Sequence, residues 1–332
     1  MIQFLSQLII KNAKRGATMS NVMAGPGVCG DWLRECVACG TERIRYWGRK
    51  SFQYTDGARS GEFLIYRCDH CGTGFLNRPP HANWLKSIYR FSGQALTNAI
   101  TLNDVLAREA KYPNVILDAD SIAVQANRFD RSGISRALDI GSGFGFYTRA
   151  LRKIGYQTVS INPGQYENAV FKELNGDEPL GLAFETYQTS ARFGVVLMSQ
   201  VLEHLLEPDQ AIRKVSGILA PGGVFACAVP NYNSFLVKLL GTRDNACLWV
   251  PEHVNYFSVN GLKTLMEKNG LNVIQIKQVT RIPYQALSKR LGLTNRAASI
   301  ADTLVEYLQI PLARLMNFFG LGIYIHLYAV KK

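Results

Sequence analysis

The sequence predicts an α/β protein: a doubly wound, mostly parallel sheet of seven strands, with a small cysteine-bearing module in front of it. Three observations support this fold class. From residue 136 onward, short apolar segments alternate with amphipathic helical ones, a pattern typical of parallel sheets. The first of these strands runs into alternate glycines, Gly141, Gly143 and Gly145, which open a helix. Two matched Cys-x2-Cys pairs precede the alternating region.

The chain of 332 residues divides into four expected parts. These are a flexible leader (1–30), the cysteine-bearing module (31–79), a helical linker or cap (80–133) and the α/β domain (134–332) with a helical insert at 281–321. The apolar N-terminal stretch is followed rather than preceded by basic residues, an order that is wrong for a secretory signal. No run of 18 apolar residues exists, so no spanning helix and a cytoplasmic location are expected.

The cysteine-bearing module contains two pairs of identical spacing, Cys36 with Cys39 and Cys68 with Cys71, each followed by glycine. This spacing is typical of a tetrahedral zinc site built from four thiolates. Such a site is structural, because four protein ligands leave no position open for chemistry. Two disulfides are the alternative, but a reducing compartment is expected in the absence of a secretory signal. The pattern therefore favours a zinc ribbon that holds a structural Zn²⁺.

Strands and helices can be assigned along the α/β domain from the period of its apolar residues. The expected strands are 137–140, 158–161, 194–199, 224–229, 272–279 and 323–330. The clearest helices are 146–154, 208–219 and 259–269.

About forty residues separate the last two strands, which is too long for a simple turn. Residues 281–321 carry an apolar stripe at near-helical spacing, and Pro311 is expected to break it into two short helices. Basic residues accompany the stripe. The insert is therefore either a helical cover packed on the sheet or a peripheral contact with a membrane surface.

The composition is that of a globular protein with unevenly placed charge. Apolar residues make up 47% and charged residues 19%, and the formal net charge is +12. The basic surplus lies in residues 1–135 and 277–332, whereas the glycine-rich core between them is neutral. Basic ends indicate either contact with anionic partners or a solubilising surface.

Five motifs of this chain resemble, in order, those of the class I S-adenosylmethionine-dependent methyltransferases. They are 138–143 (LDIGSG), 193–196 with 201–204 (FGVV and VLEH), 219–223 (LAPGG), 229–231 (VPN) and 251–258 (PEHVNYFS). The resemblance covers roughly residues 130–332 and implies a Rossmann-like fold. The last segment resembles a type 11/12-like subgroup that carries an N-terminal four-cysteine zinc ribbon and often modifies sugars or other small metabolites.

The resemblance implies that S-adenosylmethionine binds at the carboxyl edge of the sheet. Asp139 and the glycine loop would hold its methionine part. Asn162 stands where the family usually has an acidic residue for the ribose diol. An asparagine can accept from one hydroxyl and donate to the other, so binding is expected to survive with altered strength. The implied cofactor residues are Asp139, Gly141, Ser142, Gly143, Gly145, Asn162, Ser199 and Gln200.

Methyl transfer requires alignment of the nucleophile with the methyl group and, for many acceptors, removal of a proton. His253 follows the fifth strand beside Glu252, a carboxylate expected to raise its pKa and orient its ring. His253, Glu252 and Tyr256 are therefore the expected catalytic residues, although Tyr256 is also compatible with a place in the core. His204 is either a second base or a structural histidine that bonds to backbone.

The expected function is methyl transfer to a sugar, a glycan precursor or another small molecule, with a phosphate-bearing sugar well suited to the basic ends. An RNA methyltransferase that uses the zinc ribbon to bind RNA is one alternative. A non-catalytic scaffold that binds the cofactor is another. Residues 199–202 (SQVL) replace the Asn-Pro-Pro-aromatic motif common among enzymes that methylate base amines, which weighs against nucleic acid bases as acceptors.

Overall fold

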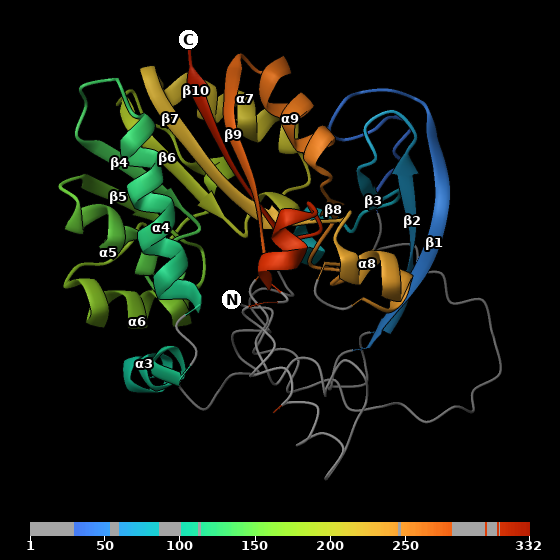
Figure 1. Ribbon diagram of the computed structural model, residues 1–332, viewed down its shortest axis with the longest axis horizontal. Coiled ribbons are helices and arrows are strands. Elements are labelled where there is room, and N and C mark those ends of the chain that lie inside the picture. Colours follow the sequence, from blue (N-terminus) through green and yellow to red (C-terminus); the bar gives the residue numbers. More distant parts are fainter. Residues whose placement is uncertain are drawn as a thin grey trace.

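We describe a computed structural model that covers residues 30–53, 60–85, 101–111, 114–244, 247–280, 303, 311 and 313–332. Its two sheets have six and four strands (Figure 1). The predicted leader lies almost entirely outside the described residues, and so does most of the predicted insert at 281–321, including the effect of Pro311 on the chain before it. Within the described residues, no helix has both the length and the apolar character needed to cross a bilayer.

The six-stranded sheet confirms the predicted α/β class. Its strands are β4 (Arg136–Ile140), β5 (Gln157–Ile161), β6 (Phe193–Ser199), β7 (Leu219–Pro230), β9 (Leu271–Val279) and β10 (Tyr324–Lys331), in the order β5-β4-β6-β7-β10-β9. β4 pairs in parallel with β5 and β6, and β6 pairs in parallel with β7. Only β10 runs against the other strands of this sheet, since it is antiparallel to both of its neighbours, β7 and β9. The sheet is therefore mostly parallel, as predicted.

The strand number differs from the expected seven: the described residues contribute six strands to this sheet. Beside the edge strand β5, Leu180 forms only a single parallel bridge with Ile161. The chain around Leu180 is too short and too irregular there to add a seventh strand.

Helices cover both faces of the six-stranded sheet (Figure 1). α4 (Asn114–Phe129) and α5 (Phe146–Lys153) pack on one face, where Val195 and Leu197 of β6 are buried. α7 (Pro208–Ile218) and α9 (Val259–Lys268) pack on the other, where Val196 and Met198 are buried. This alternation follows from the two-residue period of a strand. α4 comes from the segment expected to be a linker or cap, and it forms part of a layer of the α/β domain.

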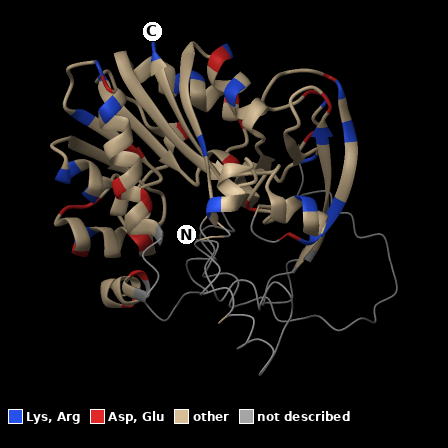
Figure 2. Ribbon diagram, viewed as in Figure 1, with Lys and Arg blue, Asp and Glu red and all other residues tan. Residues whose placement is uncertain are grey.

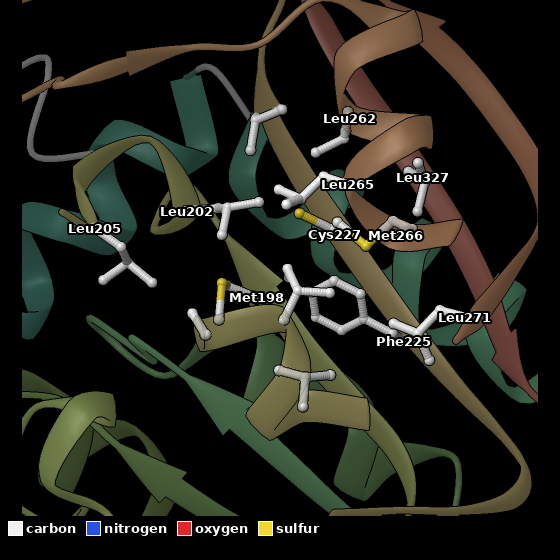
Figure 3. Packing of buried hydrophobic residues seen from close by; sticks show 14 of the residues in the cluster. Met198, Leu202, Leu205, Phe225, Cys227, Leu262, Leu265, Met266, Leu271 and Leu327 are labelled. Carbon is white, nitrogen blue, oxygen red and sulfur yellow. The ribbon is translucent and has the colours of Figure 1, made fainter. Parts of the chain in front are cut away.

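Figure 3 shows the buried cluster on the face of the sheet that α7 and α9 cover. Leu265 and Met266 of α9 lie beside Cys227 of β7, which is 2% exposed. Burying side chains of this size stabilises the fold by about 1.5–3 kcal/mol each. The same cluster reaches Cys36 and Cys71, so the cysteine-bearing module shares a core with the sheet.

The four-stranded sheet joins the cysteine-bearing module to the α/β domain. β1 (Ile44–Gln53) and β2 (Ser60–Cys68) form an antiparallel hairpin, and β2 pairs with β3 (Gly74–Leu76). β3 in turn pairs with β8 (Asn255–Tyr256), which lies inside the 251–258 motif. The motif predicted to carry catalytic residues therefore contains the edge strand of the four-stranded sheet.

Further helices include α3 (Leu102–Lys111), α6 (Gln165–Asn175) and α8 (Phe235–Leu240). α9 begins at a side-chain cap, because the Ser258 hydroxyl accepts a hydrogen bond of 2.9 Å from the Gly261 amide. That hydroxyl also donates to the Cys71 carbonyl over 2.6 Å, so one side chain fixes both α9 and the second cysteine pair.

Candidate functional site

The turn between β4 and α5 is built from glycines with left-handed backbone. Gly141, Gly143 and Gly145 have φ values of +68°, +52° and +88°. A Cβ at Gly141 would overlap Val201, and one at Gly145 would overlap Asn175. Because Gly145 offers no side-chain cap, α5 begins at a turn that exposes backbone rather than side chains.

Two polar side chains are buried at this turn. Ser142 is 2% exposed, and its hydroxyl has no hydrogen-bond partner among the described residues. Asp139 is 1% exposed and accepts a hydrogen bond of 2.6 Å from the Thr148 hydroxyl, which lies 2.7 Å from that of Ser160. Burial raises the pKa of Asp139 to about 6. In the structure Asp139 therefore ties the turn to α5 and β5, and its direct contact with a cofactor stays a prediction.

Asn162 lies at the carboxyl end of β5 and is 7% exposed. Its amide nitrogen donates to the Gly164 carbonyl over 3.2 Å and to Asn168 Oδ1 over 2.8 Å. The nitrogen is thus occupied within the protein, and Asn162 Oδ1 is left to accept from a ligand. The expected donation from Asn162 to a ribose hydroxyl does not fit this arrangement.

The end of β6 lies beside the glycine turn, because β4 and β6 are neighbours in the sheet. The Ser199 hydroxyl donates to the Tyr147 hydroxyl over 2.9 Å. Gln200 has a φ of +56°, and its amide donates to the Ala228 carbonyl over 2.7 Å. A left-handed backbone is uncommon for a residue with a side chain and clusters at functional sites. The predicted cofactor residues of β4, β5 and β6 thus meet at one edge of the sheet, where open α/β sheets bind their ligands.

Two histidines lie together at the same edge. His204 ends the short helix η2 (Leu202–His204) after β6, His253 precedes β8, and their ring centroids are 4.7 Å apart. His204 Nδ1 donates to the Glu252 carbonyl over 2.9 Å, and His253 Nδ1 donates to the Cys247 carbonyl over 2.8 Å. A carbonyl oxygen can only accept, so Nδ1 carries the proton in both rings. Nε2 is then the basic nitrogen of each neutral ring.

Burial sets the charge of this histidine pair. It lowers the pKa of His204 to about 4, and it lowers the pKa of His253 well below its ordinary value, with His204 adding to the effect. The prediction that Glu252 raises the pKa of His253 is therefore wrong, since the cost of charging a ring that is 1% exposed outweighs any neighbouring carboxylate. Both rings are neutral at pH 7.

Tyr256 is buried in β8 rather than placed at a surface. Its ring stacks on that of Tyr232 with centroids 6.0 Å apart, and neither hydroxyl has a hydrogen-bond partner among the described residues. A buried hydroxyl without a partner costs about 1–3 kcal/mol. Both rings belong to one buried cluster of apolar residues. Tyr232 had no signal in the sequence beyond its place after the 229–231 motif.

Glu203 is a second residue that the sequence did not single out, although it belongs to the VLEH motif. It is 1% exposed, neither carboxylate oxygen has a partner among the described residues, and burial raises its pKa to about 8. Glu203, His204 and His253 each offer one metal-ligating atom, and these atoms lie within 4.8 Å of one another. The group could therefore act by proton transfer or hold a divalent cation.

The four predicted cysteines come together in the ribbon. The sulfur of Cys36 lies 3.6 Å from that of Cys71, and Cys39 and Cys68 are also 3.6 Å apart. All four sulfurs lie within 4.8 Å of one another. These separations exceed a disulfide bond of about 2.05 Å. They are close to the edge of about 3.8 Å that four sulfurs make around zinc at about 2.3 Å, so the cluster fits a tetrahedral metal site.

Comparison with known proteins gives one family. Residues 102–276 match the family described as "Methyltransferase domain", which is more than half of the chain. The C-methyltransferase NovU of Streptomyces niveus is 28% identical over 186 residues, which cover 52% of this chain and 43% of NovU. A ubiquinone biosynthesis O-methyltransferase of Cereibacter sphaeroides is 27% identical over 186 residues, covering 51% of this chain and 74% of that protein. The chain thus spans less than half the length of NovU.

A solved structure from Thermotoga maritima is also similar. It is titled as a SAM-dependent methyltransferase and possible histamine N-methyltransferase. It has a TM-score of 0.44 and 17% identity, and the match covers 68% of this chain and 96% of that one.

Proposed function

This chain is an S-adenosylmethionine-dependent methyltransferase of the methyltransferase-domain family, and on that premise we propose that its acceptor is a sugar, a glycan precursor or a similar small molecule. The observation that carries the proposal is the neutral histidine pair that follows β6, the strand next to the one that leads into the glycine turn. The pair provides a neutral imidazole, His253, whose Nε2 carries no proton.

The residues at the turn fit the cofactor. The buried Ser142 hydroxyl is left for a ligand, Asn162 offers its Oδ1, and the glycine turn lets backbone approach closely. When bound, S-adenosylmethionine supplies a methyl group already activated by a sulfonium. The remaining tasks of this chain are to orient the acceptor, exclude water and take up a proton.

His253 is the proposed base. Its Nδ1–H is fixed on the Cys247 carbonyl, so Nε2 takes the proton from an acceptor hydroxyl or acidic carbon as that atom is methylated. The carbonyl of Glu252 holds the neighbouring His204 ring in the matching tautomer. Tyr256 and Tyr232 offer their unpartnered hydroxyls to the acceptor.

A carbon or oxygen acceptor suits this arrangement better than an amine that is already neutral. Methylation at oxygen or carbon leaves a proton to be removed, which is the task of a base. The two relatives named above support this choice, because one is a C-methyltransferase and the other an O-methyltransferase.

The basic residues of the ribbon give little support to the RNA alternative. Figure 2 shows several Lys and Arg positions, coloured blue on the ribbon, along β1 and β2. Arg45 is paired with Asp69 over 2.6 Å, and Arg49 lies 3.6 Å from Glu62. Lys50 donates to the carbonyls of Thr242 and Asp244 inside the protein. Three basic residues of β1 are therefore engaged within the chain rather than left for phosphates.

The proposal can be tested with S-adenosylmethionine labelled in its methyl group. Purified protein is incubated with sugar nucleotides, phenolic compounds and RNA, with and without a chelator of divalent cations. We expect label in a small molecule, in amounts that do not depend on the chelator. Label in RNA alone, or none with any acceptor while the cofactor binds, would contradict the proposal. Loss of activity with the chelator while the zinc content of the ribbon is unchanged would reassign the histidine pair to a metal.

The ribbon cluster is proposed to hold one structural Zn²⁺ through Cys36, Cys39, Cys68 and Cys71, which requires a reducing compartment such as the cytoplasm. Cys36→Ser is expected to lower the zinc content from about one ion per chain to nearly none and to lower the Tm, because structural zinc contributes folding free energy. Elemental mass spectrometry and thermal unfolding measure both.

Cys227→Ser is the matched control, because Cys227 is a buried cysteine of β7 outside the cluster. This variant is expected to keep its zinc even if its Tm falls. A wild-type protein purified without metal, or a Cys36→Ser variant with unchanged zinc content and Tm, would remove the zinc assignment.

A further inference from the structure

The ribose side of the cofactor site lacks the acidic residue that its position favours. Asn162 stands at the end of β5 and has only Oδ1 to offer a hydroxyl, because its amide nitrogen is occupied within the protein. A ribose diol has two hydroxyls to donate. One ribose hydroxyl is therefore left for a second hydrogen-bond acceptor. A charged hydrogen-bond acceptor would bind this hydroxyl more strongly than a neutral one.

Glu167 places a carboxylate beside Asn162. It lies in the first turn of α6, three residues after Gly164, the N-cap of that helix. A Cβ built on Gly164 would overlap the Glu167 carboxylate and lie 3.2 Å from Asn162 Nδ2. The carboxylate therefore folds back over Gly164 toward the end of β5, and a glycine at this position leaves space for it.

The carboxylate is desolvated without a cationic partner. Glu167 forms no salt bridge with any residue that the structure describes, and burial raises its pKa, opposed only by its own backbone amide. The helix N-terminus favours a negative charge there. A partly buried carboxylate with so few donors gains free energy from any hydroxyl that reaches it.

We propose that the Glu167 carboxylate accepts a hydrogen bond from a ribose hydroxyl of the cofactor, next to Asn162 Oδ1, and so supplies the negative charge that Asn162 lacks. This inference rests on the proposed function, because it assumes that the turn after β4 binds S-adenosylmethionine. A purely structural Glu167 would only cap α6, and the two roles give different results in binding experiments.

The test is calorimetric binding of S-adenosylhomocysteine and its 2′-deoxy and 3′-deoxy analogues to the full chain without acceptor. Glu167→Gln is expected to weaken S-adenosylhomocysteine about tenfold or more, as for loss of a hydrogen bond to a charged group. At least one deoxy analogue should bind the wild type more weakly than S-adenosylhomocysteine does. The difference between these two ligands should be much smaller for Glu167→Gln. Glu173→Gln, on the exposed side of the same helix, should bind like the wild type.

Asn162→Asp gives a second, opposite readout. In the Glu167→Gln background it should restore affinity, whereas in the wild-type background it should not improve it, because two carboxylates would then repel each other. Tm is measured for every variant. A lower Tm for Glu167→Gln with unchanged binding of all three ligands would overturn the inference and leave Glu167 as a cap. No binding by the wild type would instead overturn the proposed function itself.

Discussion

Gly143→Asp is expected to reduce the affinity for S-adenosylmethionine and S-adenosylhomocysteine by ~100-fold or more. Gly143 has a φ of +52° in the turn between β4 and α5. A carboxylate there would add bulk and a negative charge to the turn that is proposed to hold the methionine part of the cofactor, which itself carries a carboxylate. Placing like charges together costs several kcal/mol, and each 1.4 kcal/mol is about tenfold in affinity. Calorimetry with the purified protein measures the loss.

Gly133→Asp is the matched control for this variant. Gly133 also has a left-handed φ, +70°, and a Cβ there would meet nothing within 4 Å. It precedes β4, at the opposite end of the strand from the turn. Both variants therefore impose the same kind of backbone strain, but only Gly143→Asp should lose the cofactor. Zinc content should be unchanged in both. Normal binding by Gly143→Asp would show that the cofactor lies elsewhere.

His253→Asn is expected to lower kcat by ~100-fold or more, with the affinity for S-adenosylhomocysteine nearly unchanged. The asparagine amide can replace Nδ1–H as the donor to the Cys247 carbonyl, so the local fold is kept while the basic Nε2 is removed. His81→Asn, at an exposed histidine, is the control and should keep full activity. An unchanged kcat for His253→Asn would remove His253 from the mechanism.

The pH dependence of the rate gives an independent check of the same residue. Burial lowers the pKa of His253, so the ring is already neutral well below pH 6.5. Protonation of His253 therefore causes no loss of rate as the pH falls through 6.5, whereas a base with an ordinary histidine pKa would lose half its rate there. Glu203, close to the pair, has a pKa of about 8 and takes up its proton above this point. We expect no half-loss of kcat near pH 6.5 when kcat is measured against pH.

Much of the fold could be predicted because its strands and helices are formed by short, continuous segments of the chain. β4, the glycine turn and α5 are consecutive, and the bounds found for β5, β6 and β9 differ from those expected by at most one residue. β7 is longer than expected because Pro221 and the glycines after it continue the strand rather than end it. The expected seventh strand has no counterpart among the six that the described residues contribute, and beside β5 only Leu180 pairs with the sheet.

The chemistry of the site was less accessible from the sequence. The Glu252–His253 neighbours suggested a raised pKa, but burial, which depends on the whole surrounding fold, lowers it. Glu203 and Tyr232 carried no local signal, and only their buried oxygens without described partners mark them. Asn162 was recognised as a departure from the family pattern. Glu167 beside it could be found only from the structure, where its carboxylate lies against Gly164.

The sequence by itself determined the order of strands and helices, the glycine turn and the metal-type spacing of the cysteines, because these depend on residues close together in the chain. Only the tertiary structure decided that β8 completes the ribbon sheet through β3, and that His253 meets His204 at the edge of the larger sheet. Such contacts join residues that are about fifty or more positions apart. Their burial, and with it the charge they carry, depends on packing from several elements at once, which no local pattern of residues records.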